Sequence, residues 1–413
     1  MVTKYDIFEF ACTNRHPLRP IDVVKKFKKS ESEYNNIHRM LRALSQEGLL
    51  TKTTYGFQIK RSENANILYQ IIFHCLRNSI NYNSLLNPGI AKFISQAIKR
   101  KEITSKDIDL HPVTFRKYVD VLHKDGLLLI ISEKPLRVKV FYNVLLNNLL
   151  VYFGYRHKTL PEDTINYFKE IEKDLVKFRR LKRRNETKYQ QIIEDFEVSF
   201  IHHSLSLEGN PITLNETKRI LEDKVIPANL KIKDVDEIKN YQKALLQMIK
   251  DSHDKKPLTL QTVLEYHYLA MQHNPDIAGK IRKIEIHISG NPDFKIAKAE
   301  NIEKELERLT KEYNDFIKEE KANLKEILAF SVYFHNEFQH IHPFVDGNSR
   351  TTRLITFHLL QSKDIPIFDI PYGLLDEYLS CTKGSRTRED KRLLSNLQKI
   401  ILFNLKKINT KLI

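Results

Sequence analysis

The chain has 413 residues, 41% of them hydrophobic, which is enough to bury more than one core and predicts two or three domains. Its net charge of +16 suits an acidic partner such as nucleic acid or a polyphosphate, although a lysine-rich composition explains it equally well. Three widely spaced cysteines argue against a disulfide framework, and no apolar run is long enough to span a membrane, so we expect a cytoplasmic protein without a membrane partner.

Residues 1–155 contain a weak internal repeat with an offset of 78 residues. Each copy carries an amphipathic helix that ends at a glycine, Gly48 or Gly126, placed as a C-terminal cap. We expect a shorter helix before each long helix, and two strands after it. The long helices are expected at 34–47 and 112–125, the shorter ones near 20–28 and 104–109, and the strand pairs at 49–54 with 55–60 and 127–133 with 136–141. This order resembles a winged helix-turn-helix, in tandem at 1–80 and 81–155.

A winged helix reads DNA with its long third helix and touches phosphates with its hairpin. The two candidate reading helices carry basic side chains, namely His38, Arg39 and Arg42, then Arg116, Lys117 and Lys124. Many winged helices attached to enzymes bind protein or form a homodimer instead. DNA binding, protein docking and dimerisation therefore stay open as alternatives.

Residues 156–195 are expected to form one charged helical connector before the next domain. Its basic run at 177–184 could face phosphates, but a solvated helix face is the commoner use of such a run.

Helical periodicity dominates from residue 196 to 413, where we expect one further domain. A first helix is predicted at about 196–208, and later helices at 235–249, 258–271, 299–316, 324–340, 350–362 and 392–408. Residues 279–290 alternate apolar and polar side chains before a Gly-Asn turn, which predicts a strand or hairpin. The expected fold class is mainly α, with a small β-hairpin and two winged-helix modules in front.

The twelve residues from His342 to Arg353 are the most informative part of the chain. An apolar helix ends before this run and another begins within it, and a restarting helix presents free N–H groups and a positive dipole to an anion. Arg350 and Arg353 are three residues apart and share one helix face. Because Pro343 follows His342, we expect an extended backbone at His342. The run predicts a phosphate site beside a base.

Each residue type in the run has a chemical use. The imidazole of His342 can accept a hydroxyl proton near neutral pH. Asp346 offers hard oxygen ligands of the kind that Mg²⁺ binds together with substrate phosphates. The turn can supply backbone N–H groups and the helix can supply guanidinium groups, from Gly347, Asn348, Ser349, Arg350 and Arg353.

This run resembles the signature of the Fic family of nucleotidyl transferases, His-Pro-Phe-x-Asp/Glu-Gly-Asn-Gly-Arg-x-x-Arg. The resemblance continues upstream through 335–341 and into a helix at 237–245, and it covers about residues 195–400. It implies a Fic-type helical domain whose hairpin flap, near 281–288, holds a target segment by strand addition. One position departs, because Ser349 stands where the family usually has glycine.

The resemblance implies a protein adenylyltransferase that uses ATP and Mg²⁺. His342 would deprotonate a serine, threonine or tyrosine of an unidentified target protein, and that oxygen would attack the α-phosphorus of ATP. Asp346 would hold Mg²⁺, and the α-, β- and γ-phosphates would be contacted by Asn348, Arg350 and Arg353. Tyr378 is a candidate contact for the adenine ring. The alternatives are another donor such as UTP, phosphoryl transfer, or a DNA-binding regulator whose Fic domain only senses nucleotide.

A second motif of the same family precedes the signature. Ser204 and Glu208 fit the pattern Ser/Thr-x-x-x-Glu-Gly/Asn of an inhibitory helix, and they lie one turn apart just before Gly209. The resemblance implies that Glu208 pairs with Arg353 and removes the partner of the γ-phosphate. It also implies that Glu208 can position a water, so that removal of AMP is a second activity. From the residues alone, Glu208 reads as an ordinary surface glutamate before a helix cap.

Overall fold

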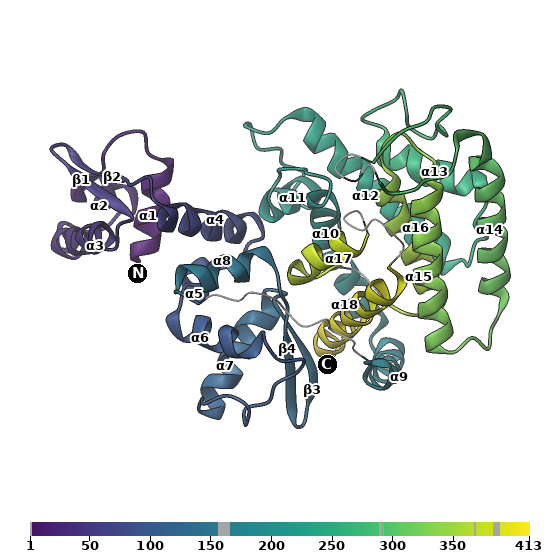
Figure 1. Ribbon diagram of the computed structural model, residues 1–413, viewed down its shortest axis with the longest axis horizontal. Helices are drawn as coiled ribbons and strands as arrows, with labels where there is room; N and C mark the ends of the chain where they lie inside the picture. The colour runs from purple at the N-terminus through teal and green to yellow at the C-terminus, as the bar shows by residue number, and fades with distance from the viewer. Residues whose placement is uncertain (1, 156–165, 289–290, 292, 367–368, 383–388) are drawn as a thin grey trace. The chain divides into compact units, whose positions relative to one another are not determined.

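The computed structural model describes residues 2–155, 166–288, 291, 293–366, 369–382 and 389–413. The chain divides into two compact units. Unit 1 comprises Met1–Arg100, Ser105–Val121 and Tyr142–Pro161, and unit 2 comprises Lys101–Thr104, Leu122–Phe141 and Glu162–Ile413. Both are mainly helical, as predicted (Figure 1). No described helix is both long and apolar enough to cross a membrane.

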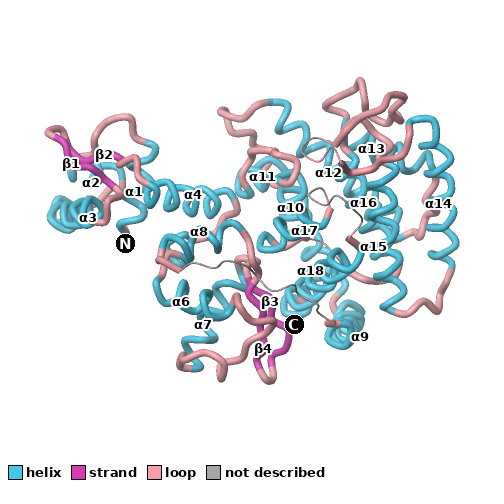
Figure 2. The backbone as a smooth tube through the Cα atoms, viewed as in Figure 1, coloured by secondary structure: helices cyan, strands magenta, loops and turns pink. Residues whose placement is uncertain are grey.

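Unit 1 consists of helices and one antiparallel hairpin. Its elements are α1 (Lys4–Thr13), α2 (Pro20–Lys26), η1 (Glu31–Glu33), α3 (Tyr34–Gln46), β1 (Leu50–Thr53), β2 (Gly56–Ile59), α4 (Glu63–Arg77), α5 (Tyr82–Leu85), α6 (Pro88–Ala97), α7 (Pro112–Lys124), which continues past the unit boundary, and α8 (Val144–Tyr152). The first predicted module thus has its expected order of helices followed by a hairpin, with Leu50 opposite Ile59 (Figure 2). Its identity as a winged helix stays a prediction.

The second predicted module differs from the expectation in one element. Helix α7 and the strands β3 (Leu128–Glu133) and β4 (Leu136–Val140) are where the sequence predicted them. The expected helix at 104–109 is wrong, since these residues form a short turn and bends. The backbone N–H and C=O of Ile103 bond to Val138 at 2.9 Å each, so this segment satisfies its polar groups against β4 instead of within a helix. The hairpin belongs to unit 2, and the boundaries of this module stay a prediction.

Unit 2 contains the predicted phosphate site. After the hairpin its elements are α9 (Phe168–Arg184), α10 (Glu186–Ser206), α11 (Leu214–Leu221), α12 (Ile232–His253), α13 (Leu260–Met271), η2 (Ala299–Asn301), α14 (Ile302–Lys318), α15 (Leu324–Ile341), α16 (Asn348–Ser362), η3 (Tyr372–Leu374), α17 (Leu375–Cys381) and α18 (Asp390–Lys411). Most of these lie within a few residues of the helices predicted from periodicity.

The single connector helix expected at 156–195 is wrong. Its first ten residues lie outside the described residues, and the rest is split at Asn185, where α9 ends and α10 begins with a backbone φ of −138°. Helix α9 is not a solvated connector, because Ile171, Leu175 and Phe178 form a buried stripe that packs in the unit 2 core. Most of its charged residues occupy the other face, and the buried Asp174 is paired with Lys406. The inhibitory motif ends α10, as predicted, but the helix begins ten residues earlier than expected.

Helix α16 lies at the centre of unit 2, beside α15 and in contact with α12 and α13 (Figure 1). Every residue of α16 except Gln361 is buried. Its first two turns nevertheless contain Arg350, Thr351, Thr352 and Arg353. Buried polar and charged groups need partners, so the contacts of these side chains define the candidate site.

Candidate active site

The signature loop begins at the end of α15. This helix is capped at its start by Asn323 and Glu326, each side chain accepting the other's backbone N–H, and it ends at His342. The prediction of an extended backbone at His342 is wrong, because this residue has φ 49° and ψ 60°. Its N–H still donates to Phe338 at 3.0 Å, so the left-handed turn closes the helix, and Pro343 disfavours only the right-handed alternative. A strained non-glycine residue is common at functional sites.

One contact sets the tautomer of His342. Its Nδ1 lies 3.2 Å from the carbonyl oxygen of Gln339, which can only accept a hydrogen bond. Nδ1 therefore carries the proton of the neutral ring, and Nε2 carries the lone pair. The imidazole is half-buried at the turn.

The turn before α16 requires glycine. Gly347 has φ 82°, and a Cβ atom there would lie 2.9 Å from Sδ of Met271 and 3.0 Å from Nε2 of His267. With Gly347 in place, α16 starts at Asn348, and its first N–H groups have no partner within the helix. Free N–H groups at a helix start suit an anion, and the phosphate site stays a prediction.

The loop is held in shape from inside. The Asn348 side chain accepts from the N–H of Phe344 at 2.9 Å and donates to its carbonyl at 2.7 Å. The Phe344 ring stacks on His267 with centroids 3.6 Å apart. His267 accepts from Gly279 N–H through Nδ1, so its Nε2–H donates to the Asp346 carbonyl at 2.9 Å. Burial lowers the pKa of His267 to about 4, which keeps the ring neutral.

Arg350 is buried between two carboxylates. Its Nη1 donates to Oε1 of Glu237, and its Nη2 donates to Oδ2 of Asp346 at 3.0 Å. The Arg350 side chain is 4% exposed, whereas that of Asp346 is 60% exposed. Asp346 therefore forms the open side of this cluster and Glu237 the buried side.

Arg353 contacts the inhibitory motif directly. Its Nη2 donates to Oε1 of Glu208 at 2.9 Å and to the Ser204 carbonyl at 3.1 Å, and its Nε donates to Ser204 Oγ at 2.7 Å. The Ser204 hydroxyl donates to Tyr241 at 2.8 Å, and Tyr241 donates to the Arg350 carbonyl at 3.3 Å. Burial acts to lower the pKa of Arg353, but Glu208 and the hydroxyl groups of Tyr241 and Tyr378 raise this pKa by more than burial lowers it. Arg353 therefore stays a cation.

The family model that describes the Fic/DOC family matches residues 257–360, which include α13, α14, α15 and the signature loop. This part of the chain is a Fic domain. The inhibitory motif on α10 and Glu237 on α12 lie before the matched range, and Tyr378 lies after it.

Curated relatives named "Protein adenylyltransferase Fic" match over 179 residues, or 43% of this chain. The relative from Drosophila grimshawi is 27% identical over 36% of its own length, and that from Drosophila mojavensis is 28% identical over 34%. The chain thus spans about a third of the length of the curated relatives it matches.

Solved structures of Fic proteins are also similar. A Fic domain containing signaling protein from Bacteroides thetaiotaomicron has a TM-score of 0.48 and 22% identity, over 59% of this chain and 93% of that one. Fic-1 from C. elegans has a TM-score of 0.48 and 17% identity, over 83% of this chain and 97% of that one.

Ser349 is the second residue of α16 in the Fic domain. It is buried and has a right-handed helical backbone, since it is not among the residues with positive φ. The serine therefore needs no conformation that only glycine provides.

Tyr378, on α17, is buried beside Arg353 rather than on an open surface. Its hydroxyl lies 2.8 Å from Nε2 of His335, and the two rings and Arg353 line a cavity of about 20 Å³. Burial raises the pKa of Tyr378 and lowers that of His335 to about 4. The predicted contact of Tyr378 with adenine stays a prediction.

The strand predicted in the flap at 281–288 is wrong, since these residues form no ladder (Figure 2). Of the expected Gly-Asn turn, Gly290 lies outside the described residues, and the N–H of Asn291 donates to the Ile288 carbonyl at 3.0 Å. Buried Arg282 explains the difference, because its guanidinium donates to the carbonyls of His342, Ile284 and Ala297, and its N–H donates to Pro343. These bonds fasten the segment to the signature loop, where a second strand would otherwise supply the partners.

Four residues of the site were missed or undervalued in the sequence. The sequence indicates Glu237 and Tyr241 only as part of a helix similar to one in the family, although their spacing of four residues places both on one helix face. No motif in the sequence marks His267, which is buried and fixes the loop. Arg282 sits in an alternating pattern that resembles a strand, and nothing in that pattern marks it.

Proposed function

We propose that this chain is a protein adenylyltransferase restrained by its own Glu208. The observation that supports it best is the contact of Glu208 with Arg353 within the signature site. A carboxylate bound to a buried guanidinium has the charge and geometry of a phosphate oxygen. Glu208 thus occupies the place of an anion at Arg353, on the helix that follows His342 and the signature turn.

In the proposed reaction, Nε2 of His342 takes the proton from a serine, threonine or tyrosine hydroxyl of a target protein. That oxygen forms a bond to the α-phosphorus of ATP, and the bond from the α-phosphorus to the bridging oxygen breaks. Pyrophosphate leaves, and AMP stays on the target. The N-terminus of α16, with Gly347, Asn348 and Ser349, would offset the charge that develops on the phosphates, together with Arg350 and Arg353.

Asp346 is the residue that would hold Mg²⁺. Its carboxylate is exposed at the turn, where it accepts from Gly347 N–H and Arg350. No group of three or more candidate ligands exists among the described residues. A single carboxylate still fits Mg²⁺, which usually binds one or two carboxylates together with substrate phosphates and water. When bound, the ion would neutralise phosphate charge.

The restraint follows from competition for Arg353. While Glu208 holds this guanidinium, a γ-phosphate has no cation to meet, and ATP would bind in a pose unsuited to in-line attack. Displacement of Glu208 would free Arg353 for the nucleotide. Glu208 could also orient a water for removal of AMP from a target, which we include as a second activity.

The segment 283–288 is the proposed docking place for the target. Its backbone makes no ladder bonds among the described residues, and the Ile284 side chain is 60% exposed. An extended target peptide could pair with the backbone groups of this segment that Arg282 and Asn291 leave open, which needs backbone groups more than particular side chains.

Two labels of ATP test the reaction class. The Glu208→Gly chain should transfer label from α-labelled ATP to itself or to a target, and none from γ-labelled ATP. His342→Ala in the same background should remove the transfer. Label from γ-labelled ATP would indicate phosphoryl transfer instead, and equal labelling by wild type and both variants would overturn the proposal. UTP serves as the competing donor.

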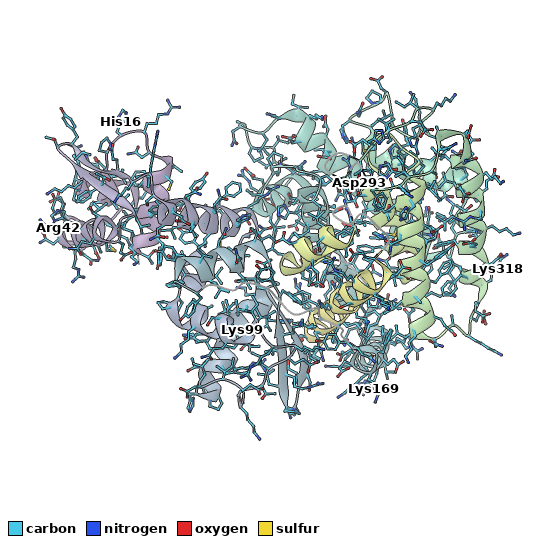
Figure 3. The ribbon with its side chains drawn as sticks, viewed as in Figure 1. His16, Arg42, Lys99, Lys169, Asp293 and Lys318 are labelled. Atoms are coloured by element: carbon cyan, nitrogen blue, oxygen red, sulfur yellow. The ribbon has the colours of Figure 1, made fainter. Side chains whose placement is uncertain are left out.

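Nucleic-acid binding by unit 1 is a second proposed activity. Residues 1–100 carry 16 Lys and Arg residues against 7 Asp and Glu residues. Arg39 and Arg42 are exposed on α3, as a reading helix requires. A separate groove of about 740 Å³, between α1, β2 and α4, is lined by Arg15, His16, Lys60 and Arg61. Figure 3 shows His16 and Arg42 on different edges of unit 1.

A gel-shift assay with duplex DNA would test this activity. Binding through phosphates should weaken steeply as salt rises, and the variant Arg39→Ala, Arg42→Ala should bind more weakly. Binding that is absent at low salt would leave protein docking or homodimer formation as the role of unit 1. Sedimentation of the full chain distinguishes these two alternatives.

A further inference from the structure

Glu237 lies between the inhibitory segment and the signature helix. It projects from α12 and its side chain is 14% exposed. One carboxylate oxygen accepts from Nη1 of Arg350, and the other accepts from Nδ2 of Asn210 at 2.8 Å. Asn210 comes two residues after Glu208, so a single side chain touches both parts of the candidate site.

Asn210 fixes the orientation of this carboxylate. It is buried, and its Nδ2 also donates to the Asp234 carbonyl at 3.1 Å, while its Oδ1 accepts from Ile212 N–H at 3.1 Å. An amide held at three points offers its donor to Glu237 in one direction only. The other oxygen of Glu237 is thereby presented to Arg350.

Arg350 depends on this contact for its position. Its other ionic partner, Asp346, is largely exposed and is the proposed ligand of Mg²⁺. Its Nε is buried and has no partner among the described residues. Glu237 is therefore the buried anchor that remains if Asp346 turns to another ligand, and a guanidinium fixed in advance loses less entropy when it binds phosphate.

The same helix also holds the backbone of Arg350. Tyr241 lies one turn after Glu237 and donates to the Arg350 carbonyl, while it accepts from Ser204. Helix α12 thus contacts Ser204, at the start of the inhibitory motif, and Asn210, just after its end. It also contacts both the side chain and the backbone of Arg350.

We propose that Glu237 is a positioning residue that holds Arg350 ready for the second phosphate of a nucleotide and ties it, through Asn210, to the segment that carries Glu208. The inference rests on the proposed function, which supplies the nucleotide. Its consequence is selective. Loss of the Glu237 charge should weaken the binding of ADP and ATP, which have a β-phosphate, and should leave the binding of AMP unchanged. General damage to the fold would weaken the binding of all three nucleotides.

The test uses fluorescent methylanthraniloyl derivatives of AMP, ADP and ATP with Mg²⁺ and the full chain. The Glu208→Gly chain, in which Arg353 is free, is compared with the same chain carrying Glu237→Gln, which keeps the shape and removes the charge. The dissociation constants for ADP and ATP should rise about tenfold, as expected for loss of a charge-assisted anchor, and the constant for AMP should stay the same. Asn210→Ala should give the same pattern with a smaller change.

Asp236→Asn is the matched control. It removes a carboxylate from the neighbouring position of α12, and Asp236 has no hydrogen bond to either signature arginine among the described residues, so it should change none of the three constants. Unchanged ADP and ATP binding in Glu237→Gln would overturn the inference and leave the proposed function intact. An equal loss for AMP, ADP and ATP would also overturn it. If the Glu208→Gly chain binds no adenine nucleotide, the proposed function falls and the inference with it.

Discussion

Replacing Glu208 with glycine should lower the free energy of unfolding of the nucleotide-free protein. It should also make the protein bind ATP more tightly than ADP, because Arg353 becomes free to contact the γ-phosphate. Arg353 is 2% exposed, and Glu208 is the one carboxylate that hydrogen-bonds it among the described residues. Loss of one partner from a buried pair costs about 3–5 kcal/mol. Because Ser204 still accepts from Arg353 and Glu208 lies at the edge of the site, we expect about 2–3 kcal/mol here.

Thermal unfolding with added nucleotide measures both effects. In wild type, ADP and ATP should stabilise the protein equally, since Arg353 is already occupied. In Glu208→Gly, ATP should stabilise it more than ADP, because only ATP supplies an anion to the freed guanidinium. A nucleotide at a hundred times its dissociation constant adds about 2.7 kcal/mol to the free energy of unfolding, which is enough to offset the loss caused by the substitution.

The variant Glu208→Gln separates charge from chain flexibility. It keeps the length of the side chain and removes the charge, so it should behave as Glu208→Gly does. If neither variant is less stable than wild type, or if ATP and ADP remain equivalent in both, then Glu208 does not control Arg353 and the reasoning is refuted.

Four further predictions follow from the site. His342→Ala should abolish adenylate transfer in the Glu208→Gly background and should lower the midpoint of unfolding only slightly, through loss of the Nδ1 bond to Gln339. Residual transfer at the parent rate would exclude His342 as the base. Burial lowers the pKa of His267 and His335 to about 4, so the unfolded chain takes up their protons first. Each of these two histidines should therefore stabilise the fold less as pH falls from about 6.5 towards 4, by up to about 3 kcal/mol, whereas Glu197 and Asp125, whose pKa values burial raises to about 7 and about 6, act in the opposite direction. Replacing His335 with asparagine should reduce the loss of stability towards low pH in urea unfolding from pH 7.5 to 5, and the same pH dependence in variant and wild type would contradict this. Arg282→Lys should lower transfer to a protein target more than it weakens ATP binding, because a compact ammonium cannot span the carbonyls of His342, Ile284 and Ala297 as the guanidinium does. Equal losses measured with titrated ATP would argue against that role. Ser349→Gly should lower the free energy of unfolding by no more than about 1 kcal/mol and leave the transfer rate unchanged, since the backbone at this position is already helical. A large gain in the transfer rate would show that the serine obstructs the site.

Local patterns in the sequence predicted a large part of unit 2. The periodicity of α12 to α16 and the spacing of Arg350 and Arg353 depend only on residues within a few turns of each other. The ion pair of Glu208 with Arg353 joins residues 145 apart, and it was anticipated from the family motif, not from the residues alone.

The features that the sequence did not reveal depend on packing between distant segments. Glu237 and Arg350 are 113 residues apart, and only the contact of α12 with α16 brings them together. The flap alternates like a strand, but Arg282 bonds across 60 residues to His342 and takes the place of a second strand. The left-handed turn at His342 likewise depends on where α15 ends, which Pro343 alone does not fix.

The central claim is that this chain moves AMP onto a hydroxyl under the control of Glu208. Intact-mass analysis of the Glu208→Gly chain, incubated with Mg²⁺ and a mixture of ATP, GTP, CTP and UTP, tests it most directly. We predict a gain equal to one or more AMP groups, on the chain or on an added target. The gain should be smaller in wild type and absent when His342→Ala is added. A gain of another nucleotide or of phosphate alone, or no gain in any variant, would contradict the claim.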